Sequence, residues 1–185
     1  MHEIERKALA VLIGALILVG VNYVIYRREH LLREGQAVFL ELASVDWMQE
    51  DDNIMVLDFQ VTHAIDRAHD SYDGTTRSGI VVLRLDERGV GHFERLGECA
   101  ALQASEICMR YQRQPGDWRR ESRLSTDAFF FQEGTGERYA AARYGEFRVA
   151  PNGVALLKTL RDANLQLLGD APEAPEDDDA EDASE

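Results

Sequence analysis

The sequence is poor in the residue patterns from which most active sites are built. Its 185 residues include only two cysteines, Cys99 and Cys108, and no other cysteine or nearby histidine completes a zinc-ligand set around them. It has no Gly-x-Ser-x-Gly sequence and no glycine-rich phosphate loop. Lys158 is the only lysine after residue 7, which argues against a serine–lysine hydrolase. We therefore predict no catalytic residues, no cofactor and no metal site.

One short stretch does gather residues of metal-ligating types. It contains His63, Asp66, His69, Asp70 and Asp73. The two histidines are six residues apart, a spacing that matches neither one face of a helix nor the alternation of a strand. We interpret these residues as the polar side chains of a surface connection.

Positive charge is scarce, and the excess of negative charge is uneven. The formal net charge is −14, and residues 170–185 alone carry nine acidic and no basic side chains. An acidic, proline-containing end lacks the apolar surface that would offset the entropy of ordering it. We predict a disordered acidic tail over residues 170–185. So acidic a chain also argues against a nucleic-acid partner.

Long apolar runs are absent except at the start of the chain. Residues 8–26 carry no charge and lie between Arg6-Lys7 and Arg27-Arg28. About 20 apolar residues span the hydrocarbon core of a bilayer. The run is too long for a signal peptide and lacks an Ala-x-Ala cleavage site. We predict a short tail over residues 1–7 and a transmembrane anchor over 8–26, whose helix continues to about residue 34 before Gly35. The flanking basic residues do not decide the orientation; they only weakly favour a cytoplasmic location for the part of the chain after the anchor.

Residues 36–169 read as one soluble, β-rich domain. Apolar runs separated by glycine-containing turns are typical of antiparallel strands and hairpins. The fold class predicted is mainly β: one N-terminal transmembrane helix, then a compact, mostly antiparallel β domain with a short helix, a pattern compatible with two packed sheets. The strands are expected at 37–42, 54–61, 80–85, 90–96, 106–113, 129–131, 146–149 and 154–157, with turns at 71–78, 86–89, 114–117 and 150–153 and the short helix at 135–142.

The two cysteines flank a predicted loop and leave two alternatives open. If the strand ends lie side by side, an oxidising compartment would favour a disulfide between Cys99 and Cys108. In the cytosol the same residues would be two buried thiols.

The stretch from Phe129 to Arg161 resembles the C-terminal signature of the GDYXXLXY family of membrane-anchored bacterial proteins. In that family an aromatic strand is followed by Glu-Gly, a Tyr-x-x-Ala segment, Tyr-Gly and an Arg-Val hairpin closed by glycine. The matching positions here are Phe131, Glu133, Gly134, Tyr139, Ala142, Tyr144, Gly145, Arg148, Val149 and Gly153.

The upstream part departs from the family pattern. A turn that precedes the name-giving motif is matched by Leu42, Val45 and Asp46, but Trp47 replaces its proline. The motif itself falls on residues 52–59. Leu57 is retained and Phe59 replaces the last tyrosine, whereas Asp52, Asn53 and Ile54 replace glycine, aspartate and the first tyrosine.

The resemblance implies a location and a kind of partner, but no reaction. The family has no assigned biochemical activity and is associated with a multi-spanning membrane protein that also lacks a role. It implies an anchor in the bacterial inner membrane with a cytoplasmic N-terminus and a periplasmic body, which would favour the Cys99–Cys108 disulfide.

We therefore expect a non-enzymatic single-pass inner-membrane protein whose periplasmic β domain binds a membrane-protein partner or envelope complex. The alternative is an envelope enzyme or ligand-binding domain with a pocket near Glu133 and Tyr139. Glu133 follows three phenylalanines, so it is either a desolvated functional carboxylate or a side chain that pairs with Arg143 or caps the next helix.

Overall fold

The computed structural model describes residues 2–47, 53–69, 77–113, 122–126 and 128–169, and the side chains of residues 2–8, 10, 11 and 44–47 lie outside that description. In chain order the elements are α1 (His2–Glu34), β1 (Gln36–Trp47), β2 (Ile54–Phe59), α2 (Gln60–Ala68), β3 (Ser78–Leu85), β4 (Gly91–Gly97), β5 (Glu106–Arg113), β6 (Ser122–Arg123), β7 (Ala128–Phe130), the 3₁₀ helix η1 (Gly136–Tyr139), β8 (Tyr144–Val149) and β9 (Ala155–Arg161).

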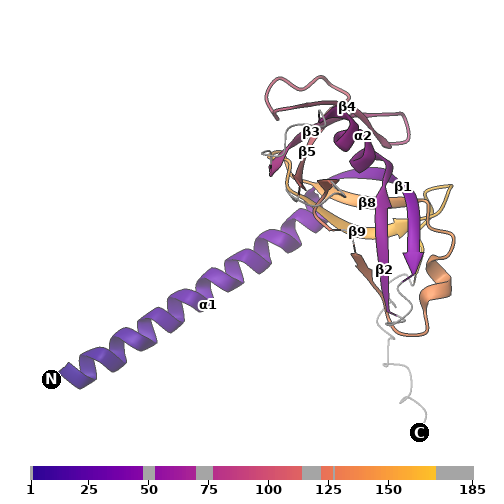
Figure 1. Cartoon of the computed structure of the whole chain (residues 1–185). Helices are drawn as coiled ribbons and strands as arrows, with labels where there is room; N and C mark the ends of the chain where they lie inside the picture. Colours follow the sequence, from indigo (N-terminus) through magenta and orange to yellow (C-terminus); the bar gives the residue numbers. More distant parts are fainter. Residues whose placement is uncertain (1, 48–52, 70–76, 114–121, 127, 170–185) are drawn as a thin grey trace, which may run out of the picture.

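The N-terminal helix α1 is a single rod that leaves the β body at one end (Figure 1). It includes the apolar stretch and ends at Glu34, where the Gly35 N–H donates to Leu31 O at 2.8 Å. Within the described part of the chain, no helix combines the length and the apolar character needed to cross a bilayer.

The body is mainly β, as predicted, and every pair of neighbouring strands in it is antiparallel. The described residues form a five-stranded sheet in the order β7-β2-β1-β8-β9 and a four-stranded sheet in the order β4-β3-β5-β6. The long strand β1 lies at the centre of the first sheet, and the hairpin β8–β9 lies beside it (Figure 1). Both predicted hairpins, β3–β4 and β8–β9, are present.

The core lies between the two sheets. Alternation along β1 turns Val38 and Leu40 to the same face, and both are fully buried. They meet side chains of the second sheet at Gly91, where a Cβ atom would lie within 3.2 Å of Val38, Leu40 and Leu83 at once. Close packing of the two sheets therefore leaves little room for a side chain at position 91.

Two predicted elements differ in kind from the structure, and strands β1 and β9 also run past their predicted ends. The strand predicted over 54–61 ends at Phe59, because residues 60–68 form α2. Val61 and Ile65, one helical turn apart, are buried against the core, and Thr62 Oγ1 donates to Phe59 O at 2.7 Å. The helix predicted over 135–142 is the single 3₁₀ turn η1. The predicted turns at 71–78 and 114–117, in large part, and the acidic tail lie outside the described residues.

Candidate functional site: the junction of the long helix and the five-stranded sheet

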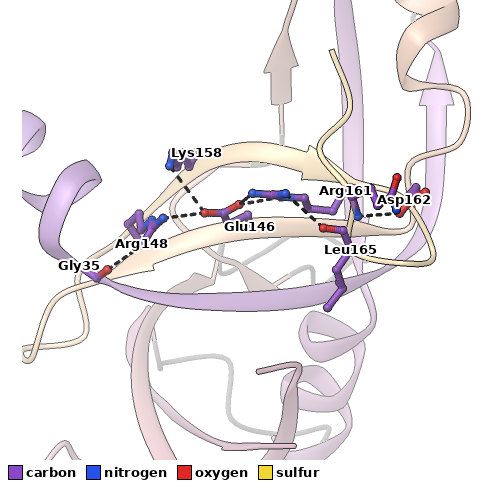
Figure 2. Close-up of polar contacts among 8 residues, drawn as sticks. Gly35, Glu146, Arg148, Lys158, Arg161, Asp162 and Leu165 are labelled. Atoms are coloured by element: carbon purple, nitrogen blue, oxygen red, sulfur yellow. Dashed lines mark hydrogen bonds and ion pairs between the residues drawn. The ribbon is translucent and has the colours of Figure 1, made fainter. Parts of the chain in front are cut away.

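A buried carboxylate on β8 is the centre of this site. The Glu146 side chain is 2% exposed. Arg148 lies two residues later on the same face of the strand, and Arg161 and Lys158 come from the neighbouring strand β9. In Figure 2 the three basic side chains converge on Glu146.

The contacts are direct. Arg148 Nη2 lies 3.0 Å from Glu146 Oε1, and Lys158 Nζ lies 3.9 Å from the same oxygen. Arg161 Nε donates to Oε2 at 2.8 Å, and its Nη2 is bonded to that oxygen too. A carboxylate removed from water has to be paired and hydrogen-bonded, and here both oxygens are. The three cations outnumber the carboxylate, so the cluster carries a net positive charge.

The cluster reaches the end of α1 through Arg148. Its Nη1 donates to Gly35 O at 3.2 Å, as drawn in Figure 2. A guanidinium at a helix C-terminus also interacts favourably with the helix dipole. A Cβ atom at position 35 would lie 2.6 Å from Leu31 O and 3.1 Å from Arg148 Cβ, so the close approach needs glycine. The buried carboxylate thus helps to fix where the long helix leaves the body.

Arg161 connects the same carboxylate to the turn that follows β9. Its Nη1 donates to Leu165 O at 3.2 Å. Arg88, from the turn between β3 and β4, donates to Ala163 O at 3.0 Å. The turn after β9 is therefore held by both sheets.

A crevice of about 500 Å³ lies between the last turns of α1 and the β8–β9 hairpin. We call it the helix–hairpin crevice. It combines basic, aromatic and apolar side chains with the backbone of the hairpin turn. The lining residues are Tyr23, Val24, Arg27, Arg28, His30, Leu31, Glu34, Gly35, Ala150, Pro151, Asn152, Val154 and Leu156.

A second cavity of about 360 Å³ lies between β7 and β9, the two edge strands of the five-stranded sheet. We call it the edge cavity. Phe130 on its rim is 68% exposed. Its lining is Ser125, Thr126, Ala128, Phe129, Phe130, Leu156 and Leu157.

Two of the predicted motif residues of the upstream segment, Leu57 and Phe59, are core residues. Leu57 and Phe59 are 3% and 2% exposed, and the Phe59 ring packs edge-on against Phe147 with centroids 5.3 Å apart. Gly145 lies against that ring: a Cβ atom there would be 2.8 Å from Phe59 Cε1. Asp46 pairs with Val56 across the β1–β2 ladder, and its side chain lies outside the described ones. Leu57, Phe59 and Gly145 thus serve packing.

The downstream motif residues form an aromatic group and a turn. The Tyr139 ring contacts Phe129 and Phe131, with centroids 5.0 and 5.4 Å apart. Gly134 has a φ of 78°, which explains the glycine there, and Glu133 beside it is exposed. Neither cavity described above is lined by Glu133 or Tyr139.

Ala142 follows η1, and Tyr144 begins β8. Ala142 is buried, and its N–H donates to Tyr139 O at 2.9 Å. Tyr144 is half-buried, and the Arg88 guanidinium lies 5.8 Å from the centroid of its ring.

A disulfide joins Cys99, after β4, to Cys108 of β5. It lies beneath the turn of the β8–β9 hairpin, where a Cβ atom on Gly153 would be 3.3 Å from Cys99 Sγ. Arg110 of β5 donates its backbone N–H to Gly153 O at 2.8 Å and its Nε to Asn152 O at 3.0 Å. The second sheet therefore holds the hairpin turn that lines the helix–hairpin crevice.

The histidine and aspartate side chains of residues 63–69 do not converge. His63 Nε2 lies 2.7 Å from Asp58 Oδ2, whereas His69 Nε2 lies 2.6 Å from the Tyr111 hydroxyl. Asp66 accepts hydrogen bonds from Ser122. Within the described residues, no group of three or more metal-ligating side chains lies together. Asp70 and Asp73 fall outside those residues.

Sequence reasoning missed the Glu146 cluster and the crevice. The alternation of strand β8 does place Glu146 and Arg148 on one face, which was the available signal. Burial of that face depends on Arg161 and on the turn after β9, which no local pattern indicates.

Comparisons with known proteins identify a family. No curated protein and no solved structure matches the chain. The family model described as "GDYXXLXY protein" matches residues 17–160, which is most of the chain and runs from α1 to β9. The match covers Glu146, Arg148 and the residues that line the crevice from both sides. The chain belongs to the GDYXXLXY protein family.

Proposed function

We propose that this is a non-enzymatic, single-pass protein of the bacterial inner membrane, anchored by α1, whose periplasmic β body binds an integral membrane protein. The proposal has three parts: the anchor, the side of the membrane and the partner. Each has its own support and its own test.

The exposed apolar surface of α1 is the observation that carries the proposal. Leu12, Leu16 and Val19 are 59%, 63% and 67% exposed, and apolar side chains surround the helix rather than forming one stripe. A helix that is apolar on all sides needs an apolar environment, either lipid or other membrane helices. The stretch also includes Ala8, Ala10 and Val11, whose side chains lie outside the described ones.

The disulfide supports a periplasmic body. Disulfides persist in oxidising compartments such as the bacterial periplasm and are rare in the cytosol. The Cys99–Cys108 bond lies beneath the hairpin turn that borders the junction. We give the disulfide more weight than the flanking basic residues, which weakly favour the opposite orientation.

The edge cavity supports a protein partner for the body. It lies between two edge strands and is mostly lined by apolar side chains, with Phe130 exposed at its rim. Exposed aromatic side chains next to apolar pockets are typical anchors of protein interfaces.

The anchor and its orientation are tested together. The full chain, with a topology reporter fused after Glu185, is expressed in bacteria, and membranes are washed with alkaline carbonate. We expect the protein to remain in the membrane, the reporter to be active on the periplasmic side, and thiol labelling to require prior reduction. Release by carbonate would overturn the anchor, and a cytoplasmic reporter would overturn the orientation.

The partner is tested by site-specific crosslinking in intact cells. A photo-crosslinking side chain at Phe130 is expected to capture an integral membrane protein, whereas the same group at the exposed Asn164 in the turn after β9 should not. Equal crosslinking at both positions, or none at Phe130, would contradict binding through the edge cavity.

A further inference from the structure

We propose that the helix–hairpin crevice binds the headgroup of an anionic phospholipid of the membrane that surrounds α1. This inference rests on the proposed anchor and adds a ligand that the anchor alone does not require. The evidence is the position of the crevice, its lining and the rigidity of its wall.

The crevice lies at the level of the headgroups. The uncharged stretch ends at Tyr26, and the crevice begins at Tyr23 and extends to Gly35. At the rise of an α-helix, the nine steps from Tyr26 to Gly35 cover roughly 14 Å. The headgroup layer on each side of a bilayer is roughly 5–8 Å thick, so the crevice spans it and borders the hydrocarbon.

The lining matches both parts of a phospholipid. Val24, Arg27, Arg28 and Leu31 lie on one face of α1, because their spacing follows the helical turn. Arginine binds phosphate oxygens in a planar, two-point geometry, and the neighbouring apolar side chains suit the start of an acyl chain. Arg27 also lies 5.9 Å from the centroid of the Tyr23 ring, which places its guanidinium beside the aromatic side of the crevice.

The charge of the crevice favours an anion. Arg27 and Arg28 are exposed and form no ion pair among the described residues. Glu34 is the acidic side chain of the lining, and it lies 3.4 Å from His30 Nδ1 at the end of the helix. Arg148, bonded to Gly35 O behind the crevice, adds positive charge from the sheet.

The opposite wall of the crevice is held in place before any ligand arrives. The hairpin turn that carries Pro151 and Asn152 is bonded to Arg110 of the second sheet and lies over the disulfide. Val154 projects beside this turn and is 38% exposed. A cavity of about 500 Å³ with one fixed wall is in the usual size range of small-ligand sites, which extends from about 300 to 1,000 Å³.

The test uses the full chain in lipid nanodiscs that contain phosphatidylcholine with a minor fraction of phosphatidylglycerol. After mild detergent extraction, native mass spectrometry counts the lipids of each kind that remain bound. We expect the wild type to retain phosphatidylglycerol in preference to phosphatidylcholine. Because each basic residue near an anionic surface strengthens binding by roughly fivefold, R27Q/R28Q should lower this preference by roughly 25-fold.

Two further variants distinguish specific lipid binding in the crevice from nonspecific electrostatic attraction to the helix. Arg33→Gln removes an exposed basic residue of the same helix that does not line the crevice. We expect it to lower the preference for phosphatidylglycerol less than Arg27→Gln or Arg28→Gln alone. Val154→Trp keeps every charge but fills the crevice from the sheet side, and we expect it to lower phosphatidylglycerol retention.

The outcomes distinguish this inference from the proposed anchor. Equal losses for Arg33→Gln and Arg28→Gln, together with full retention in Val154→Trp, would overturn the crevice as the site. Displacement of the bound lipid by millimolar glycerol 3-phosphate would identify a soluble phosphate ester instead and would also overturn it. If the protein survives the carbonate wash but shows no lipid preference, the anchor stands and only this inference fails.

Discussion

Glu146 in the five-stranded sheet and Glu106 in the four-stranded sheet are both buried carboxylates, but the arginines bonded to them differ in access to water. Around Glu146, Arg148 and Arg161 are only 21% and 22% exposed. Glu106 is bonded to Arg95, which is 43% exposed, and accepts the Gln103 N–H at 3.0 Å. The hydrogen bond from Arg95 lowers the pKa of Glu106 from its ordinary value of 4.5 to about 2.

The difference separates two uses of a buried charge. The Glu106 pair is local: it closes the loop between β4 and β5, and its arginine can return to water if the pair is broken. The Glu146 cluster is connected to the end of α1 through Arg148 and to the turn after β9 through Arg161. The first sheet therefore links its charges to the helix junction, whereas the second sheet supports the hairpin turn through the hydrogen bonds of Arg110, above its disulfide.

The largest effect is expected from Glu146→Gln. The substitution leaves two partly buried guanidinium groups without their counter-charge, and breaking such a pair costs about 3–5 kcal/mol of unfolding free energy. Urea unfolding followed by near-ultraviolet circular dichroism measures it. Glu106→Gln is the matched control and should cost clearly less. Equal losses of unfolding free energy for the two variants would contradict the difference between the two buried carboxylates.

Removing the disulfide should have the next largest effect. For a loop closed over a separation of nine residues, loop entropy predicts a loss of about 2–3 kcal/mol for Cys99→Ser/Cys108→Ser. Hydrogen exchange should rise in the hairpin turn at 150–153 as well as beside the cysteines, because the turn rests on the bond. An increase in hydrogen exchange confined to the loop between β4 and β5 would show that the hairpin turn does not depend on the disulfide.

Gly145→Ala tests whether the family motif serves packing in the first sheet. The added methyl group would overlap the Phe59 ring, and overpacking of this kind costs about 1–3 kcal/mol. Phe59→Leu, combined with it, should recover part of the loss in a double-mutant cycle. Additive losses in the double variant would mean that the two positions do not interact.

The smallest effect is a pH dependence that belongs to the second sheet. Because folding lowers the pKa of Glu106, its stabilising contribution is complete above pH about 4.5 and is lost as the pH falls towards 2. The stability difference between wild type and Glu106→Gln, measured by urea unfolding across this range, should shrink as the pH falls. A constant difference would contradict the role of Arg95.

Several elements could be predicted because their causes are local. The β3–β4 turn is one example: Asp86 Oδ1 accepts the N–H groups of Arg88 and Val90, both at 2.8 Å, and Gly89 has a φ of 78°. Aspartate and glycine at these positions are a turn signal in any sequence. The β8–β9 turn, with Asn152-Gly153, follows the same rule.

Other elements could not be predicted because their causes are distant in the chain. Helix α2 has no side-chain cap at its first residue, so nothing local marks its start after Phe59. Its formation depends on the burial of Val61 and Ile65 against both sheets. The motif positions Phe59 and Gly145 are 86 residues apart, and only the pairing of β2 and β8 on either side of β1 brings the ring over the glycine.

The sequence by itself determined the apolar stretch, the acidic end and the hairpins, because composition and turn chemistry act over a few neighbouring residues. The tertiary structure decided which carboxylate is buried, where α1 meets the body and that a crevice lies between them. Glu146 looks like any strand residue until β9 and the turn after it cover its face. The free energy of a buried charge depends on partners that only long-range pairing supplies.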